Sequence, residues 1–260
     1  MVKVKEPKFN SDGAPWVDME VCANSLRSAL VAQEGGAIRV ELCDNLHEGG
    51  TTPSYAQIAM AKKILDIDVF PIIRPRGGDF LYTDLEFELM KEDIKICKQL
   101  KCEGVVFGIL KADGTVDEER CAELIALAGD MEVTFHRAFD RTRDLFEAME
   151  TIIKLGCTRI LTSGGHPRVD EGVFDIEDLV IAANDRIIIM PGGGVSIENV
   201  VRLVKATKMI EFHASAMSTV PTEMMYKNSH MSEGSRKDLD YQLSDIELIK
   251  ELIYWANNPM

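Results

Sequence analysis

DVFPIIRPRGGDFLY (Asp68–Tyr82) begins as a buried β-strand and then changes character abruptly. The first half, up to Ile73, is almost entirely apolar, which is typical of a strand that is covered on both faces. Arg74 and Arg76 follow directly, in a segment that Pro75 stiffens and a glycine pair loosens. An apolar strand that ends in two guanidinium groups indicates that polar side chains gather at this strand end, so the ends of the other strands must be compared with it.

Seven further segments have the same strand-like character, and amphipathic helical segments separate them. The expected strands span residues 16–22, 37–43, 68–74, 104–110, 132–137, 159–163, 186–191 and 209–215. Eight strands that alternate with helices over about 250 residues are the pattern of a (β/α)8 TIM barrel, an α/β fold. An open, doubly wound sheet is the alternative, but it rarely uses eight such regular units. We therefore predict a single-domain barrel over residues 16–260, after a loose tail at residues 1–15, because no linker divides the chain.

Composition and charge exclude several classes of protein. The chain has 260 residues, is 46% hydrophobic and carries a formal net charge of −14, so it lacks the basic surface that nucleic acids or anionic membranes require. No apolar run approaches the roughly 20 residues that cross a bilayer, and the N-terminus has no apolar segment of the signal-peptide kind. Six cysteines without a Cys-x-x-Cys pair fit reduced thiols. We expect a cytoplasmic protein with no nucleic-acid or membrane partner.

In a TIM barrel the functional groups lie where strands end and the following loops begin. The first two strands both end in Glu-x-Cys, and alternation along a strand places the Glu and the Cys of each pair on one face. The side chains that the strand ends would bring to the mouth of the barrel are Glu20, Cys22, Glu41, Cys43, Arg74, His136 and His213. The two glutamates and two histidines are candidates for catalytic proton transfer. The structural alternative is a buried network in which these carboxylates, the arginine and His136 pair with one another.

Two glycine-rich turns follow the sixth and seventh strands. Such turns expose backbone N–H groups, and the second precedes a predicted helix, whose N-terminus would favour an anion. We predict an anion-binding wall that consists of Arg74, Arg76, Ser163, Gly164, Gly192, Gly193 and Gly194. The alternative is that Arg74 neutralises Glu20 or Glu41 and that the glycines serve only tight turns.

The segment between the last strand and the last helix, residues 215–243, is too long for an ordinary connection. Long loops of this kind are usually functional or disordered. We predict a lid over the mouth of the barrel, with a subunit interface as the alternative.

Seven motifs resemble those of the CutC copper-homeostasis family, in the same order and with similar spacing. They are EVCANS (20–25), VELCDNLHEGGTTPS (40–54), PIIRPRGGDFLY (71–82), TFHRAFD (134–140), LTSGG (161–165), MPGGG (190–194) and FHASA (212–216). The resemblance implies a cytosolic TIM barrel with a role in copper handling, usually a homo-oligomer, so we expect a dimer or tetramer. It also implies Cu(I) as the bound metal, with Cys22 and Cys43 at the positions of the family's proposed copper ligands. Some members have a further cysteine where this chain has Ala214.

From the sequence we predict a cytosolic copper-homeostasis protein that binds Cu(I) through thiols at the mouth of the barrel. The first alternative is an enzyme of lyase or isomerase type acting on a small phosphorylated or carboxylated molecule, and the second is a non-catalytic structural barrel. The partner of the chain is accordingly a copper ion or a small anionic ligand. Cu(I) prefers thiolates, which favours Cys22 and Cys43 as ligands, whereas the charged mouth favours the enzyme. The remaining cysteines fall on or near predicted helices and are expected in the core: Cys97, Cys102, Cys121 and Cys157.

Overall fold

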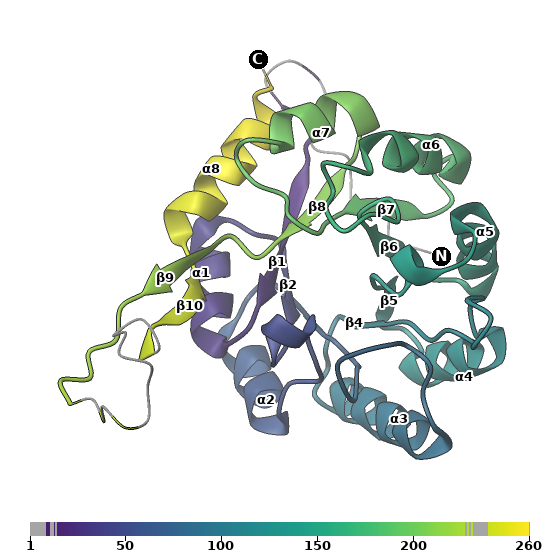
Figure 1. The fold of residues 1–260 in the computed structure, drawn as a ribbon, viewed down its shortest axis with the longest axis horizontal. Helices are drawn as coiled ribbons and strands as arrows, with labels where there is room; N and C mark the ends of the chain where they lie inside the picture. Colours follow the sequence, from purple (N-terminus) through teal and green to yellow (C-terminus); the bar gives the residue numbers. More distant parts are fainter. Residues whose placement is uncertain are drawn as a thin grey trace.

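A closed barrel of parallel strands, surrounded by helices, is formed in the computed structural model, which describes residues 9, 10, 13, 15–226, 228, 230 and 239–259 (Figure 1). The barrel strands are β1 (Asp18–Ala23), β2 (Arg39–Leu42), β3 (Asp68–Pro71), β4 (Gly104–Phe107), β5 (Glu132–Phe135), β6 (Arg159–Thr162), β7 (Ile188–Pro191) and β8 (Glu211–Ala214). The predicted (β/α)8 fold is confirmed, although each strand is shorter than the apolar run that predicted it.

Each barrel strand is followed in the chain by a helix. The helices are α1 (Leu26–Gly35), α2 (Tyr55–Ile64), α3 (Asp84–Gln99), α4 (Glu118–Ala128), α5 (Leu145–Leu155), α6 (Val173–Ala183), α7 (Val200–Thr207) and α8 (Ile246–Asn257). Two short 3-10 turns, η1 (Leu46–Glu48) and η2 (Phe139–Arg141), lie in the loops after β2 and β5. No described helix is long and apolar enough to cross a membrane.

The barrel is built from two half-barrels. Hydrogen-bonded ladders run in the orders β3-β2-β1-β8 and β4-β5-β6-β7. A parallel bridge between Ile72 and Val106 joins β3 to β4, and β7 packs beside β8, so the halves close on each other. This closure excludes the open doubly wound sheet, which would leave two edge strands unpaired.

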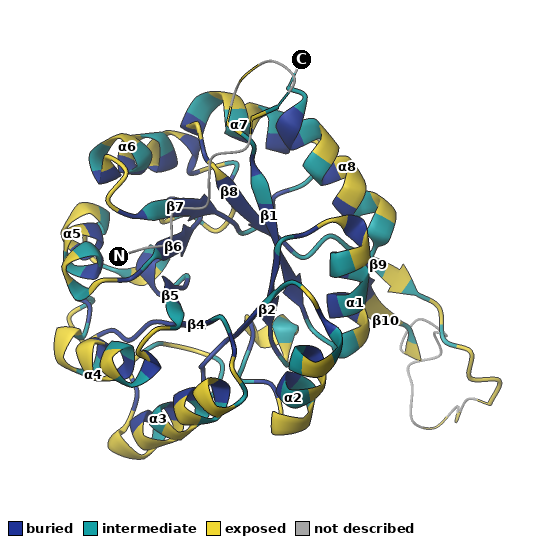
Figure 2. Cartoon of the chain, turned by 180° about the vertical axis from the view of Figure 1, so that it is seen from behind, coloured by how far each residue is buried: buried dark blue, intermediate teal, exposed yellow. Residues whose placement is uncertain are grey.

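Apolar side chains fill two separate layers, one on each side of the strands. The larger cluster lies between strands and helices and includes Val21, Val40 and Val69, whereas a smaller cluster contains Cys22, Cys43, Phe70, Ile72 and Val106. The helices bury the surface that faces the strands and expose the opposite surface (Figure 2). Because successive side chains of a strand point to opposite faces, both layers draw on the same strands, which explains the unbroken apolar runs in the sequence.

The segment after β8 contains two strands that the sequence did not predict. β9 (Met217–Val220) and β10 (Tyr241–Ser244) pair in an antiparallel ribbon. The ribbon lies next to α1 and projects from the side of the barrel (Figure 1), so its described residues give no support to a lid over the mouth. Each strand is only four residues long and residues 221–240 separate them, which hid the pairing in the sequence. Residues 227, 229 and 231–238 lie outside the described residues.

The two ends of the barrel domain are tied together by Asn257, the last residue of α8. Its side-chain oxygen accepts from the Val17 N–H at 2.8 Å, and its amide nitrogen donates to the Val17 carbonyl at 3.0 Å. Asn10, in the tail at residues 1–15, donates to the Asn257 carbonyl at 3.0 Å. These hydrogen bonds hold the last helix, α8, beside the start of the first strand, β1.

Gly104 begins β4 at a position with no room for a side chain. A β-carbon there would lie 2.3 Å from Phe70 Cε2 and 2.7 Å from the Glu132 carbonyl oxygen. Phe70 is fully buried, so we expect Gly104→Ala to lower the free energy of unfolding by about 1–3 kcal/mol, the usual cost of overpacking. Urea denaturation measures this loss. In a Phe70→Leu background, which relieves the contact with the ring, the same substitution should cost less, and an unchanged cost would assign the strain to the Glu132 carbonyl alone.

Candidate functional site

Cys22 and Cys43 lie together at the mouth end of β1 and β2. Their sulfur atoms are 3.8 Å apart, and both residues are buried. The register pairs Cys22 with Glu41 and Glu20 with Arg39, so the two Glu-x-Cys motifs are offset by two residues. Cys22 consequently donates to Glu41 Oε2 at 3.2 Å while it contacts the Cys43 sulfur. The sequence left this offset open, because it depends on how strands stagger around the closed barrel.

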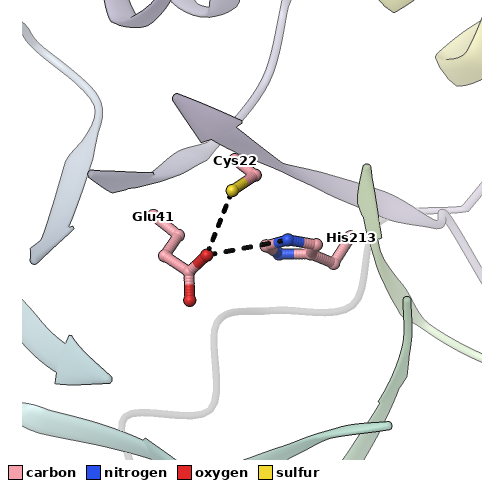
Figure 3. Close-up of side chains that lie close together, drawn as sticks. All are labelled: Cys22, Glu41 and His213. Atoms are coloured by element: carbon pink, nitrogen blue, oxygen red, sulfur yellow. Dashed lines mark hydrogen bonds and ion pairs between the residues drawn. The ribbon is translucent and has the colours of Figure 1, made fainter. Parts of the chain in front are cut away.

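His213 of β8 completes this group of side chains (Figure 3). Its Nδ1 lies 2.7 Å from Glu20 Oε1, and its Nε2 lies 3.7 Å from Glu41 Oε2. One ligand atom each from Cys22, Glu41 and His213 lie within 4.8 Å of one another. We call Cys22, Glu41, Cys43 and His213 the thiol cluster. It brings together four of the seven residues that the sequence placed at the mouth of the barrel, among them both predicted copper ligands, Cys22 and Cys43.

The surroundings of the thiol cluster favour its protonated forms. The hydrogen bond with Cys43, together with burial, raises the pKa of the Cys22 thiol well above its usual value. Burial also raises the pKa of Glu41, despite the opposing charge of His213. Burial works against a charged His213, but its hydrogen bond to Glu20 and the charge of Glu41 outweigh burial and raise its pKa. A metal ion that binds these thiols would therefore displace protons.

Two buried arginines and three carboxylates lie below the thiol cluster, and we call these five residues the charged floor. Arg39 pairs with Glu20 and Glu211, while Arg159 pairs with Glu211 at 3.1 Å and with Glu132 at 2.7 Å. Burial alone would raise the pKa of Glu20, but Arg39 and then His213 outweigh burial and hold this pKa well below its usual range. A buried charged network therefore exists beside the thiol cluster, but of the network that the sequence suggested it contains only Glu20. Its cations are Arg39 and Arg159, and neither Arg74 nor His136 takes part.

The cations of the charged floor were not among the candidates from the sequence, because both lie at strand starts. One signal was available: Arg39 is two residues before Glu41 and so shares its face of β2. The Arg39 and Arg159 guanidiniums lie 5.0 and 5.3 Å from the centre of the Phe70 ring. These cation–π contacts add to the stabilisation of the buried charges.

Arg74 and His136 lie at the ends of β3 and β5 and contact a shared aromatic residue, Phe80. The Arg74 guanidinium carbon is 5.0 Å from the Phe80 ring centre, and the His136 ring centre is 4.9 Å from it. The guanidinium donates to three backbone carbonyls at 2.7–2.9 Å, those of Glu48, Gly50 and Gly78. In the described part of the chain it forms no ion pair, so the alternative prediction that it neutralises Glu20 or Glu41 is wrong.

Arg76 has different surroundings from Arg74, although they share one motif. Its Nε donates to Glu86 Oε1 at 2.6 Å, and its terminal nitrogen donates to Asp79 Oδ1 at 2.9 Å. The rest of the guanidinium binds carbonyl groups of its own loop. Arg76 therefore stabilises the loop before α3 and the first turn of that helix.

An internal carboxylate fills the first glycine turn. Asp140 accepts from the N–H groups of Ser163 and Gly165 at 3.1 and 3.0 Å, and from the hydroxyl of Thr162 at 2.5 Å. The N–H of Gly164 donates to the Thr162 hydroxyl at 2.9 Å. The N–H groups that predicted an anion site thus bind an anion that belongs to the chain. Asp140 stands in the TFHRAFD motif, but only the fold brings it to this turn.

The second glycine turn does not lead directly into a helix, since α7 begins only at Val200. The guanidiniums beside this turn are those of Arg137 and Arg168. A side chain at Gly193 would collide with Arg137, and one at Gly194 with Arg168. The two arginines of the RPRGGD motif and the two glycine turns therefore do not form one continuous wall.

Comparison with known proteins gives consistent matches along most of the chain. A model of the CutC family matches residues 17–218. A family protein CutC from Chromobacterium violaceum is 51% identical over 217 residues, which are 84% of this chain and 88% of that protein. The human protein named copper homeostasis protein cutC homolog is 44% identical and covers 98% of this chain and 95% of its own. A crystal structure of CutC from Streptococcus agalactiae, 38% identical, superposes with a TM-score of 0.74 over 76% of this chain and 98% of that one.

Removal of Arg39 should expose the dependence of the fold on the charged floor. Arg39→Met leaves Glu20 and Glu211 buried without their shared cation, and we expect a loss of about 3–5 kcal/mol in the free energy of unfolding at pH 7. Without Arg39, burial raises the pKa of Glu20. The difference in the free energy of unfolding between the parent and Arg39→Met should therefore become smaller as the pH is lowered. Urea denaturation across a pH series measures both effects.

Arg186→Met is the matched control for Arg39→Met, because Arg186 pairs with Glu150 on the exposed surface. Its stability should change little, since exposed ion pairs contribute little. A similar loss in both variants, or a deficit for Arg39→Met that does not depend on pH, would contradict the role of the charged floor.

Proposed function

The chain belongs to the CutC family, and we propose that it binds Cu(I) in the barrel mouth through the thiolates of Cys22 and Cys43. The observation that carries this proposal is the 3.8 Å separation of two buried sulfur atoms that come from neighbouring strands. Two metal–sulfur bonds of about 2.3 Å that meet near the tetrahedral angle separate their sulfurs by about 3.8 Å. Neither thiol therefore has to move far to share a metal ion.

The donor set matches a soft metal ion. Thiolate ligands select Cu(I) over hard cations, and imidazole also suits copper. His213 offers Nε2 to the cluster because its Nδ1 is held by Glu20 at 2.7 Å. A carboxylate that binds the remote nitrogen of a ligating histidine is the usual arrangement in metal sites. Cys22, Cys43 and His213 thus supply three donors of the kind that Cu(I) accepts.

Glu41 acts as the proton acceptor of this site. Its Oε2 accepts a hydrogen bond from the Cys22 thiol, with 3.2 Å between the sulfur and the oxygen. Thiols must lose their protons to bind a metal, and burial raises the pKa of Glu41, which makes this carboxylate a better base. Cys22 can therefore lose its proton within the enclosed mouth, without direct contact with solvent.

The second candidate, an enzyme for a phosphorylated substrate, has less support from the geometry. Its phosphate site would need free N–H groups at the first glycine turn, and Asp140 occupies two of them. Copper handling is also the role named for the human and mouse relatives. Both buried thiols require a reducing compartment to remain unoxidised, so we place the protein in the cytoplasm.

Loss of either thiol should weaken Cu(I) binding strongly. We expect Cys22→Ser and Cys43→Ser each to weaken Cu(I) binding more than about 100-fold, beyond the usual effect of losing an outer-shell partner. Anaerobic titration with Cu(I) against a competing chelator measures the affinity. Cys157→Ser, which removes a buried thiol outside the thiol cluster, is the control and should bind as the parent does. Parental affinity in the Cys22/Cys43 double variant would rule out the two-thiolate site.

The affinity for Cu(I) should fall as the pH falls, because the pKa of Cys22 is raised and its proton must leave. The raised pKa of His213 adds the proton on its Nε2 to the protons that copper displaces. If Glu41 takes up one of the thiol protons, one proton fewer reaches solvent in the parent than in Glu41→Gln. The affinity of Glu41→Gln should therefore change about tenfold more per pH unit than that of the parent. Titrations over a pH series distinguish the slopes. Equal slopes in the parent and in Glu41→Gln would exclude Glu41 as the acceptor.

A further inference from the structure

We propose that Arg74 and His136 form a second binding site at the mouth of the barrel, for the oxyanion group of a small ligand. The class of ligand is a carboxylate or an inorganic oxyanion of similar size. This site is separate from the thiol cluster and does not require copper. It rests on buried hydrogen-bond donors that have no acceptor in the described part of the chain.

Arg74 is a buried cation without a counter-charge. Only 4% of the residue is exposed, and the structure describes no carboxylate within ion-pairing distance of it. Backbone carbonyls satisfy its terminal nitrogens, but its buried Nε has no described partner. A buried charge is costly unless it is paired. The guanidinium is thus held rigidly by the fold, with one donor and its charge left for an external anion.

His136 presents a second unpartnered donor. Its Nδ1 accepts from the Ala138 N–H at 3.2 Å, so the neutral ring carries its proton on Nε2. This Nε2 is buried and has no described partner. Burial and then the charge of Arg74 lower the pKa of His136 to about 3, so the ring is neutral near pH 7. Arg74 and His136 are near neighbours, since both contact the Phe80 ring, at 5.0 and 4.9 Å from its centre.

Tyr82 adds a third polar group beside Arg74. Its buried hydroxyl donates to no described acceptor. Burial raises the pKa of Tyr82 to about 12, while the charge of Arg74 and a hydrogen bond from its guanidinium oppose that rise. At neutral pH this hydroxyl is therefore another O–H donor close to Arg74. Three donor groups around one uncompensated positive charge call for an acceptor with negative charge.

The site lies next to the thiol cluster. The Gly50 carbonyl accepts from Arg74 at 2.8 Å, and a β-carbon at Gly50 would lie only 3.8 Å from the Cys43 sulfur. The loop residue Gly50 thus binds Arg74 and lies beside Cys43, so one loop connects the two sites. Since Arg74 and His136 are each only 4% exposed, the site suits a small ligand or the terminal group of a larger one.

NMR of the metal-free protein tests the site directly. The Nε–H signal of Arg74 and the Nε2–H signal of His136 are followed while formate, acetate, sulfate or phosphate is added, with chloride at equal ionic strength as reference. We expect saturable shifts of both signals, and a rise in melting temperature, with at least one oxyanion and not with chloride. A response to formate and acetate alone indicates an organic carboxylate, whereas a response to sulfate and phosphate alone indicates an inorganic oxyanion.

Matched variants assign the response to this site. Arg74→Lys keeps the charge but loses the Nε–H, so the oxyanion should bind about tenfold more weakly. Arg186→Lys, on the exposed surface and bound to Glu150, is the control and should respond as the parent does. His136→Gln gives a second variant if Arg74→Lys does not fold. The Cys22/Cys43 double variant should retain the response, which separates this site from the copper proposal.

Two results would overturn the inference. One is the absence of a saturable response of the Arg74 and His136 signals to all four oxyanions. The other is a crystal structure grown in saturating formate and sulfate in which only water bridges Arg74 Nε and His136 Nε2. Either result would mean that internal water satisfies these donors.

Discussion

The interior of this barrel depends on the pairing of buried charges. Arg39 of β2 binds carboxylates on β1 and β8, and Arg159 of β6 binds carboxylates on β5 and β8. Glu211 accepts from both guanidiniums and so links the two half-barrels at the side where β7 and β8 have no described hydrogen-bonded ladder. Any slip of register would leave one of these charges unpaired in the interior, which is strongly unfavourable. The charged floor therefore selects one way to close the barrel.

The same interaction positions the thiol cluster. One oxygen of Glu20 binds Arg39, and the other binds His213 Nδ1. The imidazole is thus oriented by a carboxylate that is itself held by the charged floor, and its Nε2 is directed toward Glu41. Burial would otherwise push Glu20 toward its neutral form. The charged floor and the candidate metal site are therefore parts of one arrangement.

Most of the fold and half of the site could be predicted from the sequence. Apolar runs that alternate with amphipathic segments indicate a parallel barrel, and Glu-x-Cys at two strand ends indicates thiols at the mouth. The offset between Cys22 and Cys43 could not be predicted, because it follows from the stagger of a closed sheet. Arg39 was missed because it begins a strand, and Asp140 because nothing local connects it to a turn 23 residues later.

The mouth of the barrel divides into regions of different chemistry. The ends of β1, β2 and β8 supply two thiols and an imidazole, which are ligands for a soft metal ion. The ends of β3 and β5 supply N–H hydrogen-bond donors beside the positive charge of Arg74. The first glycine turn is already occupied by Asp140, which mimics the anion that such a turn would otherwise bind. Asp140, which also accepts from Arg137 Nε at 2.7 Å, leaves these N–H groups without room for a phosphate oxygen. The fold thus closes one anion site with its own side chain, while the buried cation at Arg74 retains no carboxylate among the described residues. The two sides of the mouth therefore differ in what they leave for an external anion: the first glycine turn already holds a carboxylate, and Arg74 holds none among the described residues.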